Sequence, residues 1–79
     1  MKKSEARIIL YINTAAFQYC YGRKIAIQLK MDYPYTLMNL ARLTEARTLK
    51  KFKSRKALLY TLINKKALNE ASKIVRERH

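Results

Sequence analysis

The chain has 79 residues, with 18 lysines and arginines against 5 acidic residues, which gives a formal net charge of +13. Hydrophobic residues form 49% of the sequence, too large a share for a disordered basic tail. The length predicts a single small domain over residues 1–79. The charge predicts a polyanionic partner, with nucleic acid ahead of an anionic membrane surface.

The reactive side chains predict no site for catalysis or for a metal ion. No carboxylate is paired with His, Cys or Ser at a recognisable spacing. The single histidine, His79, is the last residue, and the single cysteine, Cys20, excludes an internal disulfide and a cysteine-rich zinc site. One glycine excludes a glycine-rich phosphate loop. We therefore expect no enzyme activity, no cofactor, no metal and no small-molecule ligand.

The sequence predicts neither a membrane span nor a secretory signal. The apolar run at residues 8–12 is far shorter than the roughly 18 residues of a spanning helix. It follows Lys2 and Lys3, but no small-residue cleavage site comes after it. We expect a cytoplasmic protein, in the host cytoplasm if it is viral, without a membrane partner.

The first predicted element is a helix over residues 4–16. Ser4 suits the N-cap and Glu5 suits the first turn. Residues 8–12 are all apolar, so this helix is apolar on more than one face and needs burial on all sides. It packs either deep in its own core or against a second copy. We expect the second arrangement, a homodimer whose interface comprises Ile8, Ile9, Ile12, Ile74 and Val75.

Residues 17–21, FQYCY, follow as a short strand or a bend. Within them, Cys20 is either a buried apolar residue or, near a two-fold axis, part of an intersubunit disulfide. A second helix is predicted over residues 23–30 after the only glycine, Gly22. Its inward residues are Ile25, Ala26 and Leu29.

A third helix is predicted over residues 34–46, after a break that contains Asp32 and Pro34. Its buried side follows the helical period and comprises Thr36, Leu40 and Leu43. With Leu40 at the centre of that side, the outward arc comprises Tyr35, Met38, Asn39 and Arg42.

A β-hairpin is predicted over residues 49–62, with its loop at residues 54–56. The loop contains neither glycine nor asparagine, the usual residues of tight hairpin turns. Asn64 then suits the N-cap of a last helix over residues 65–78. The apolar stripe of that helix comprises Ala67, Leu68, Ala71, Ile74 and Val75.

This order of elements resembles the winged helix-turn-helix transcription regulators, and most closely the small MarR- and ArsR-like ones. The residues that carry the resemblance are Ile25, Ala26, Leu29 and Met31 in the first helix and turn, Leu40 and Leu43 in the recognition helix, and residues 60–62 at the end of the wing. The resemblance implies an α+β, mostly helical winged helix-turn-helix fold that binds DNA. Miniature winged helices of archaeal viruses and plasmids are similar in size and composition. The chain departs from the family at Arg47 and Lys66, where glycine is usual, and at Thr36, where valine or isoleucine is usual.

The outward arc of the third helix is the candidate for reading DNA sequence. Asparagine can bond an adenine edge in two places and arginine can do so with guanine, which are the roles we expect for Asn39 and Arg42. Tyr35 is expected to bond a phosphate or pack on a thymine methyl group. Tyr33 and Met38 complete the predicted contact surface. The alternative is an ordinary solvated helix face.

The densest basic segment is residues 47–56, RTLKKFKSRK, with six positive residues and no acid. This exceeds what is needed to keep an edge strand soluble, which is the alternative explanation. We expect Arg55 to enter a minor groove and the lysines to bind phosphates. These lysines are Lys50, Lys51, Lys53 and Lys56. Arg23 and Lys24 add positive charge at a helix start, where backbone amides also favour phosphate.

The sequence as a whole favours a double-stranded DNA-binding transcription regulator, with one helix in the major groove and a basic wing on the backbone or minor groove. A second hypothesis is an RNA- or single-strand-binding module that stacks bases on its tyrosines. Those tyrosines are Tyr19, Tyr21, Tyr33 and Tyr35. A third hypothesis is a non-catalytic interaction adaptor with the same fold.

Overall fold

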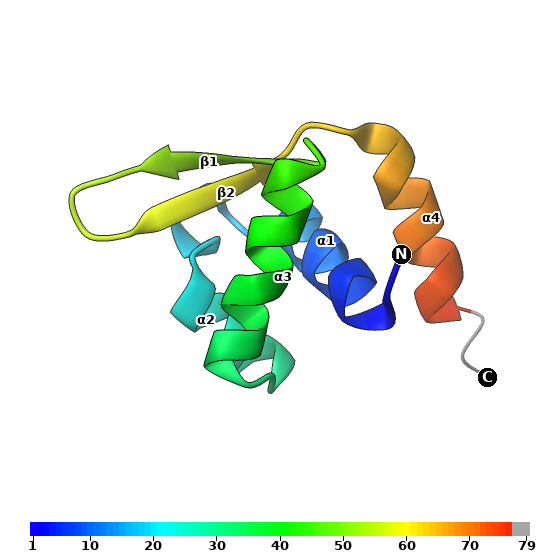
Figure 1. Cartoon of the computed structure of the whole chain (residues 1–79), viewed down its shortest axis with the longest axis horizontal. Coiled ribbons are helices and arrows are strands. Elements are labelled where there is room, and N and C mark those ends of the chain that lie inside the picture. Colours follow the sequence, from blue (N-terminus) through cyan, green and yellow to red (C-terminus); the bar gives the residue numbers. More distant parts are fainter. Residues whose placement is uncertain (77–79) are drawn as a thin grey trace.

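The structure of the protein is a computed structural model, and it describes residues 1–76. Three helices come first, then a two-stranded antiparallel hairpin, then a last helix (Figure 1). The elements are α1 (Lys3–Thr14), the 3-10 helix η1 (Phe17–Tyr19), α2 (Gly22–Leu29), α3 (Tyr33–Glu45), β1 (Leu49–Lys53), β2 (Leu58–Leu62) and α4 (Lys65–Arg76). This confirms the predicted α+β, mostly helical fold, with the architecture of a winged helix-turn-helix. The hairpin projects as a wing from the helical body.

Polar side chains accept hydrogen bonds from backbone amides at the starts of α3 and α4, and Asn64 does so as predicted. Asp32 accepts a hydrogen bond from the Tyr35 N–H at 3.3 Å, and Asn64 Oδ1 accepts one from the Lys66 N–H at 3.0 Å. Ser4 was predicted to be the N-cap of the first helix. This prediction is wrong, because α1 begins earlier, at Lys3. Lys2 occupies the cap position and donates its N–H to Glu5 Oε1 at 2.9 Å. The predicted end of the last helix at residue 78 lies outside the described residues, as does His79.

Helix α1 is the centre of the core, because α2, α3, α4 and β2 all pack against it. Ile8 and Ile9 are 0% exposed, and Ile12 is also buried. The domain therefore buries these three isoleucines without a second copy. The predicted dimer interface on Ile8, Ile9 and Ile12 is wrong for that reason. Ile74 and Val75 are half-buried against the same core.

The segment between α1 and α2 forms a 3-10 turn, and its strand character is limited to one bridge between Tyr21 and Leu59. The Tyr60 N–H donates to the Cys20 carbonyl at 2.9 Å beside this bridge. The Cys20 thiol is buried and donates to the Ala16 carbonyl at 3.5 Å. Burial raises the pKa of this thiol. Cys20 is thus a core residue, and its thiol cannot reach a second copy.

The hairpin loop contains neither glycine nor asparagine, and hydrogen bonds between Ser54 and Ala57 close it instead. The Ser54 N–H donates to the Ala57 carbonyl at 2.9 Å, and the Ala57 N–H donates back to Ser54 Oγ at 3.2 Å. Two other bends use positive φ angles on residues other than glycine, Lys30 at 54° and Arg47 at 61°. Arg47 follows α3, at a position where the family that this chain resembles usually has glycine. Within residues 1–76, no helix is long and apolar enough to cross a membrane.

Candidate nucleic-acid interface

Five of the residues predicted to contact DNA lie on α3, and four of these are exposed. Tyr33, Tyr35, Met38 and Arg42 are all exposed. Asn39 is the exception: it is 0% exposed, so its predicted place on the outward arc is wrong.

The position of Asn39 follows from helical geometry. At about 100° per residue, Thr36, Leu40 and Leu43 centre the buried side between Leu40 and Asn39, rather than on Leu40 itself. Asn39 then falls inside the buried half and Leu37 falls outside it. Leu37 is 39% exposed. The outward arc predicted from the sequence did not include this residue. The spacing of Thr36, Leu40 and Leu43 is sufficient to predict both positions.

Asn39 joins α3 to the start of α1. Its side-chain nitrogen donates to the Tyr35 carbonyl at 2.8 Å, and its side-chain oxygen accepts a hydrogen bond from Ser4 Oγ at 3.1 Å. Ser4 Oγ also lies 3.1 Å from the Tyr35 hydroxyl. The hydrogen bond with Ser4, followed by the effect of Asn39, lowers the pKa of Tyr35. These three residues form a polar tether between two helices.

The exposed face of α3 is mainly apolar. Leu37 and Met38 lie beside one cation, Arg42, whose guanidinium donates to the Met38 sulfur at 3.8 Å. Apolar side chains in a major groove contact thymine methyl groups, whereas arginine bonds guanine. This face therefore offers fewer hydrogen bonds to base edges than the sequence suggested.

The wing divides its lysines between two faces. Residues paired across an antiparallel hairpin share a face, and successive residues alternate. Lys51 is paired with Tyr60 and Lys53 with Leu58, so both lysines lie on the face that carries Tyr60. Tyr60 and Leu58 line a cleft together with Tyr33 and Leu37 of α3. This face of the wing is thus turned toward α3.

Lys50 lies on the opposite face of the wing. Its ammonium group is 5.2 Å from the centre of the Phe52 ring, and Phe52 packs edge-on against Phe17 at 5.7 Å. Arg55 and Lys56 are exposed in the loop between the strands. The predicted phosphate-binding lysines therefore do not form a single surface.

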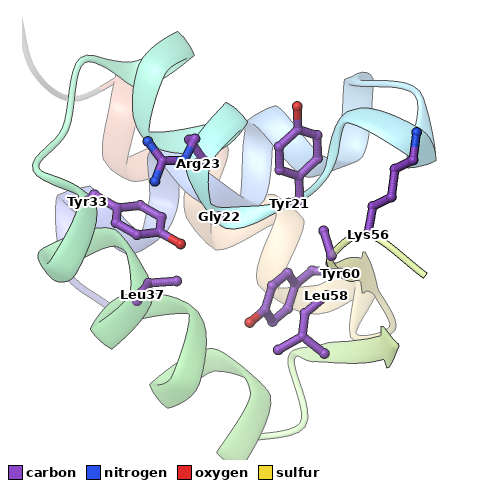
Figure 2. Close-up of a pocket in the computed structure, with 9 residues that line it drawn as sticks. Tyr21, Gly22, Arg23, Tyr33, Leu37, Lys56, Leu58 and Tyr60 are labelled. Carbon is purple, nitrogen blue, oxygen red and sulfur yellow. The ribbon is translucent and has the colours of Figure 1, made fainter. Parts of the chain in front are cut away.

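A cleft of about 390 Å³ lies between the start of α2, the first half of α3 and the wing. Figure 2 shows Tyr33 and Leu37 of α3 facing Tyr60 and Leu58 of β2 across this space. Arg23 and Lys56 also line it, and the Arg23 guanidinium is 5.0 Å from the centre of the Tyr33 ring. Lys24 points elsewhere, with its ammonium group 5.6 Å from the ring of Tyr19.

Two phenol groups meet in this cleft. Burial, followed by the neighbouring Tyr33 phenol, raises the pKa of Tyr60. The Tyr60 hydroxyl therefore stays protonated at neutral pH and can donate a hydrogen bond. No described residue is hydrogen-bonded to it or to the Tyr33 hydroxyl.

Nine of the twelve residues of the predicted DNA-binding site thus fall into three groups, and Lys24, Asn39 and Arg55 belong to none of them. Tyr33, Arg23 and Lys56 surround the cleft. Tyr35, Met38 and Arg42 lie on the exposed face of α3. The wing lysines are split between its two faces.

Neither family models nor curated proteins give a match to this chain. The likeness to MarR- and ArsR-like regulators therefore rests on the order of elements and on the residues named above.

Proposed function

We propose that this protein binds double-stranded DNA through the exposed face of α3 and the α3-facing side of the wing, and that it regulates transcription by occupying its site. The observation that carries the proposal is the strand register. It puts Lys51 and Lys53 on the wing face turned toward α3. A recognition helix flanked by phosphate-binding lysines is the usual division of labour in helix-turn-helix proteins.

The contacts expected from this arrangement are of two kinds. Arg42 bonds a guanine edge, and Met38 packs on a thymine methyl group in the major groove. Lys51 and Lys53 bind phosphates beside that groove. Because most of the interaction is with the backbone, we expect strong dependence of affinity on salt and modest sequence preference.

The test is a band-shift comparison of one labelled sequence as duplex DNA, as single-stranded DNA and as RNA, at low salt. We expect the duplex to bind most tightly. The double variant Lys51→Glu/Lys53→Glu should lose this binding. Its matched control is Lys73→Glu/Arg76→Glu, which changes the net charge equally at exposed positions near the end of α4, away from the wing. The control should keep most of the affinity.

A single-strand-binding role is the second candidate, supported by the other face of the wing. Phe17, Tyr19 and Phe52 are exposed there, and Lys24 and Lys50 lie against Tyr19 and Phe52. Exposed rings interleaved with lysines suit the stacking of bases beside bound phosphates. Tighter binding of single strands than of the duplex would favour this role. Failure to bind any of the three would favour a protein-interaction adaptor.

A further inference from the structure

We propose that the cleft between α2, α3 and the wing holds one unpaired nucleotide of a DNA strand. The base would lie between Leu37 and Leu58, with its edge bonded to the tyrosine hydroxyl groups. This inference rests on the proposed function and deepens it, because it names the form of DNA that the protein prefers.

The Tyr60 hydroxyl group is available to a ligand in the cleft. The residue is 6% exposed, and no hydrogen bond to its hydroxyl is found among residues 1–76. No buried polar side-chain atom of these residues lacks a partner, so the Tyr60 oxygen is open to solvent, on the side where the residue lines the cleft. A ligand that replaces water there can bond this hydroxyl. The Tyr33 hydroxyl points into the same space (Figure 2).

Two leucines form apolar walls of the cleft. Leu37 and Leu58 are 39% and 42% exposed, and they face each other across the cleft (Figure 2). The volume of about 390 Å³ lies within the range of small-molecule pockets. Gly22 sets the position of one wall, since a Cβ atom there would come within 2.8 Å of Leu37 Cδ2. A flat apolar ring fits between walls of this kind.

Positive charge flanks the cleft. Arg23 and Lys56 stand on two sides of the cleft, one on α2 and the other on the wing. Gly22 and Arg23 also begin α2, where no side chain caps the first backbone amides. Uncapped amides at a helix start favour phosphate. Positive groups beside an apolar slot match a nucleotide, which combines a planar base with phosphates on either side.

An unpaired nucleotide fits better than a paired one. A base within a duplex has its hydrogen-bonding edge covered by its partner and its faces covered by stacking. Moving a base out of the helix is easiest where it is mismatched or already unpaired. A bulge or mismatch in an otherwise regular duplex therefore satisfies the cleft while α3 and the wing hold the flanking DNA.

The test uses two duplexes of the same sequence, one fully paired and one with a single bulged 2-aminopurine. The full-length protein should bind the bulged duplex about tenfold more tightly, because the bulged base enters the cleft without the cost of unpairing and unstacking. The fluorescence of the bulged base should change on binding. Tyr60→Phe should reduce the preference, and Leu37→Trp, which fills the cleft from a half-exposed position, should abolish it. Ile27→Trp, at an exposed position of α2 that does not line the cleft, is the matched control and should change nothing.

The outcomes separate this inference from the proposed function. Equal affinity for the two duplexes, with unchanged fluorescence, would overturn the inference and leave duplex binding intact. A preference that survives both Tyr60→Phe and Leu37→Trp would also overturn it, because the nucleotide would then lie elsewhere. If neither duplex binds, the proposed function fails and the inference fails with it.

Discussion

The hydroxyl of Ser4 donates a hydrogen bond to the side-chain oxygen of Asn39 at 3.1 Å, which ties the first turn of α1 to the middle of α3. Asn39→Ala breaks this tether and leaves polar groups near the core unsatisfied. We expect it to lower the free energy of unfolding by about 1–3 kcal/mol. Chemical denaturation measures this loss. Combined with Ser4→Ala, the two losses should be less than additive.

The same variant also tests where Asn39 acts. Because the side chain is buried, Asn39→Ala should leave the order of preference among DNA sequences unchanged under conditions where the protein is folded. A specific loss of preference for adenine at one position would contradict the structure and restore a base contact.

Arg42 is the exposed residue of α3 best suited to reading a base. Arg42→Ala should cost about 1–3 kcal/mol of binding free energy on a preferred site and relax the preference at one base pair. Sites selected from a random duplex pool provide the measurement. Arg76→Ala, an exposed arginine on α4, is the control and should do neither. If Arg42→Ala keeps the parent's affinity and preference, the guanine contact is refuted.

Arg47 has a positive φ angle of 61°, a conformation that strains any residue with a Cβ atom. Arg47→Gly should raise the free energy of unfolding by about 1 kcal/mol, after allowing for the greater freedom of glycine in the unfolded chain. Lys66→Gly is the contrasting substitution at the other family glycine position. Lys66 lies within α4, so this change should destabilise the protein by up to about 1 kcal/mol. Loss of stability in both variants would contradict the strain argument.

The buried thiol of Cys20 predicts a pH dependence. Its pKa is raised in the folded protein, so the unfolded thiol ionises first as pH rises. The stability from the protonated thiol is therefore present below about pH 8.5, the ordinary thiol pKa, and is lost above it. Cys20→Ala removes this titration. The free energy of unfolding should fall less steeply with alkaline pH in the variant, and identical slopes would refute the prediction.

Local patterns in the sequence were sufficient to predict the fold. The spacing of Thr36, Leu40 and Leu43, the break at Asp32 and Pro34, and the cap Asn64 correspond to the helices of the structure. The hairpin formed where basic and apolar residues alternate, although Ser54 replaced the expected turn residues. These features depend on residues that are close together in the sequence, so they can be predicted from the sequence alone.

Tertiary features were harder to predict. The sequence showed that the first helix is apolar on more than one face, but it did not show that four elements of the same chain pack against it. Centring the buried side of the third helix on Leu40 alone places Asn39 on the wrong face. The meeting of Tyr33 and Tyr60 depends on how the wing packs beside α3, and no local pattern encodes that.

The salt dependence of duplex binding tests the central claim, that the α3-facing side of the wing holds DNA. The measurement is the slope of log affinity against log salt for Lys51→Gln, Lys53→Gln and Lys50→Gln on one duplex. Each lysine that binds a phosphate contributes about one unit to the slope. The account predicts a slope reduced by about one in Lys51→Gln and in Lys53→Gln, and an unchanged slope in Lys50→Gln. Unchanged slopes in all three variants would contradict it.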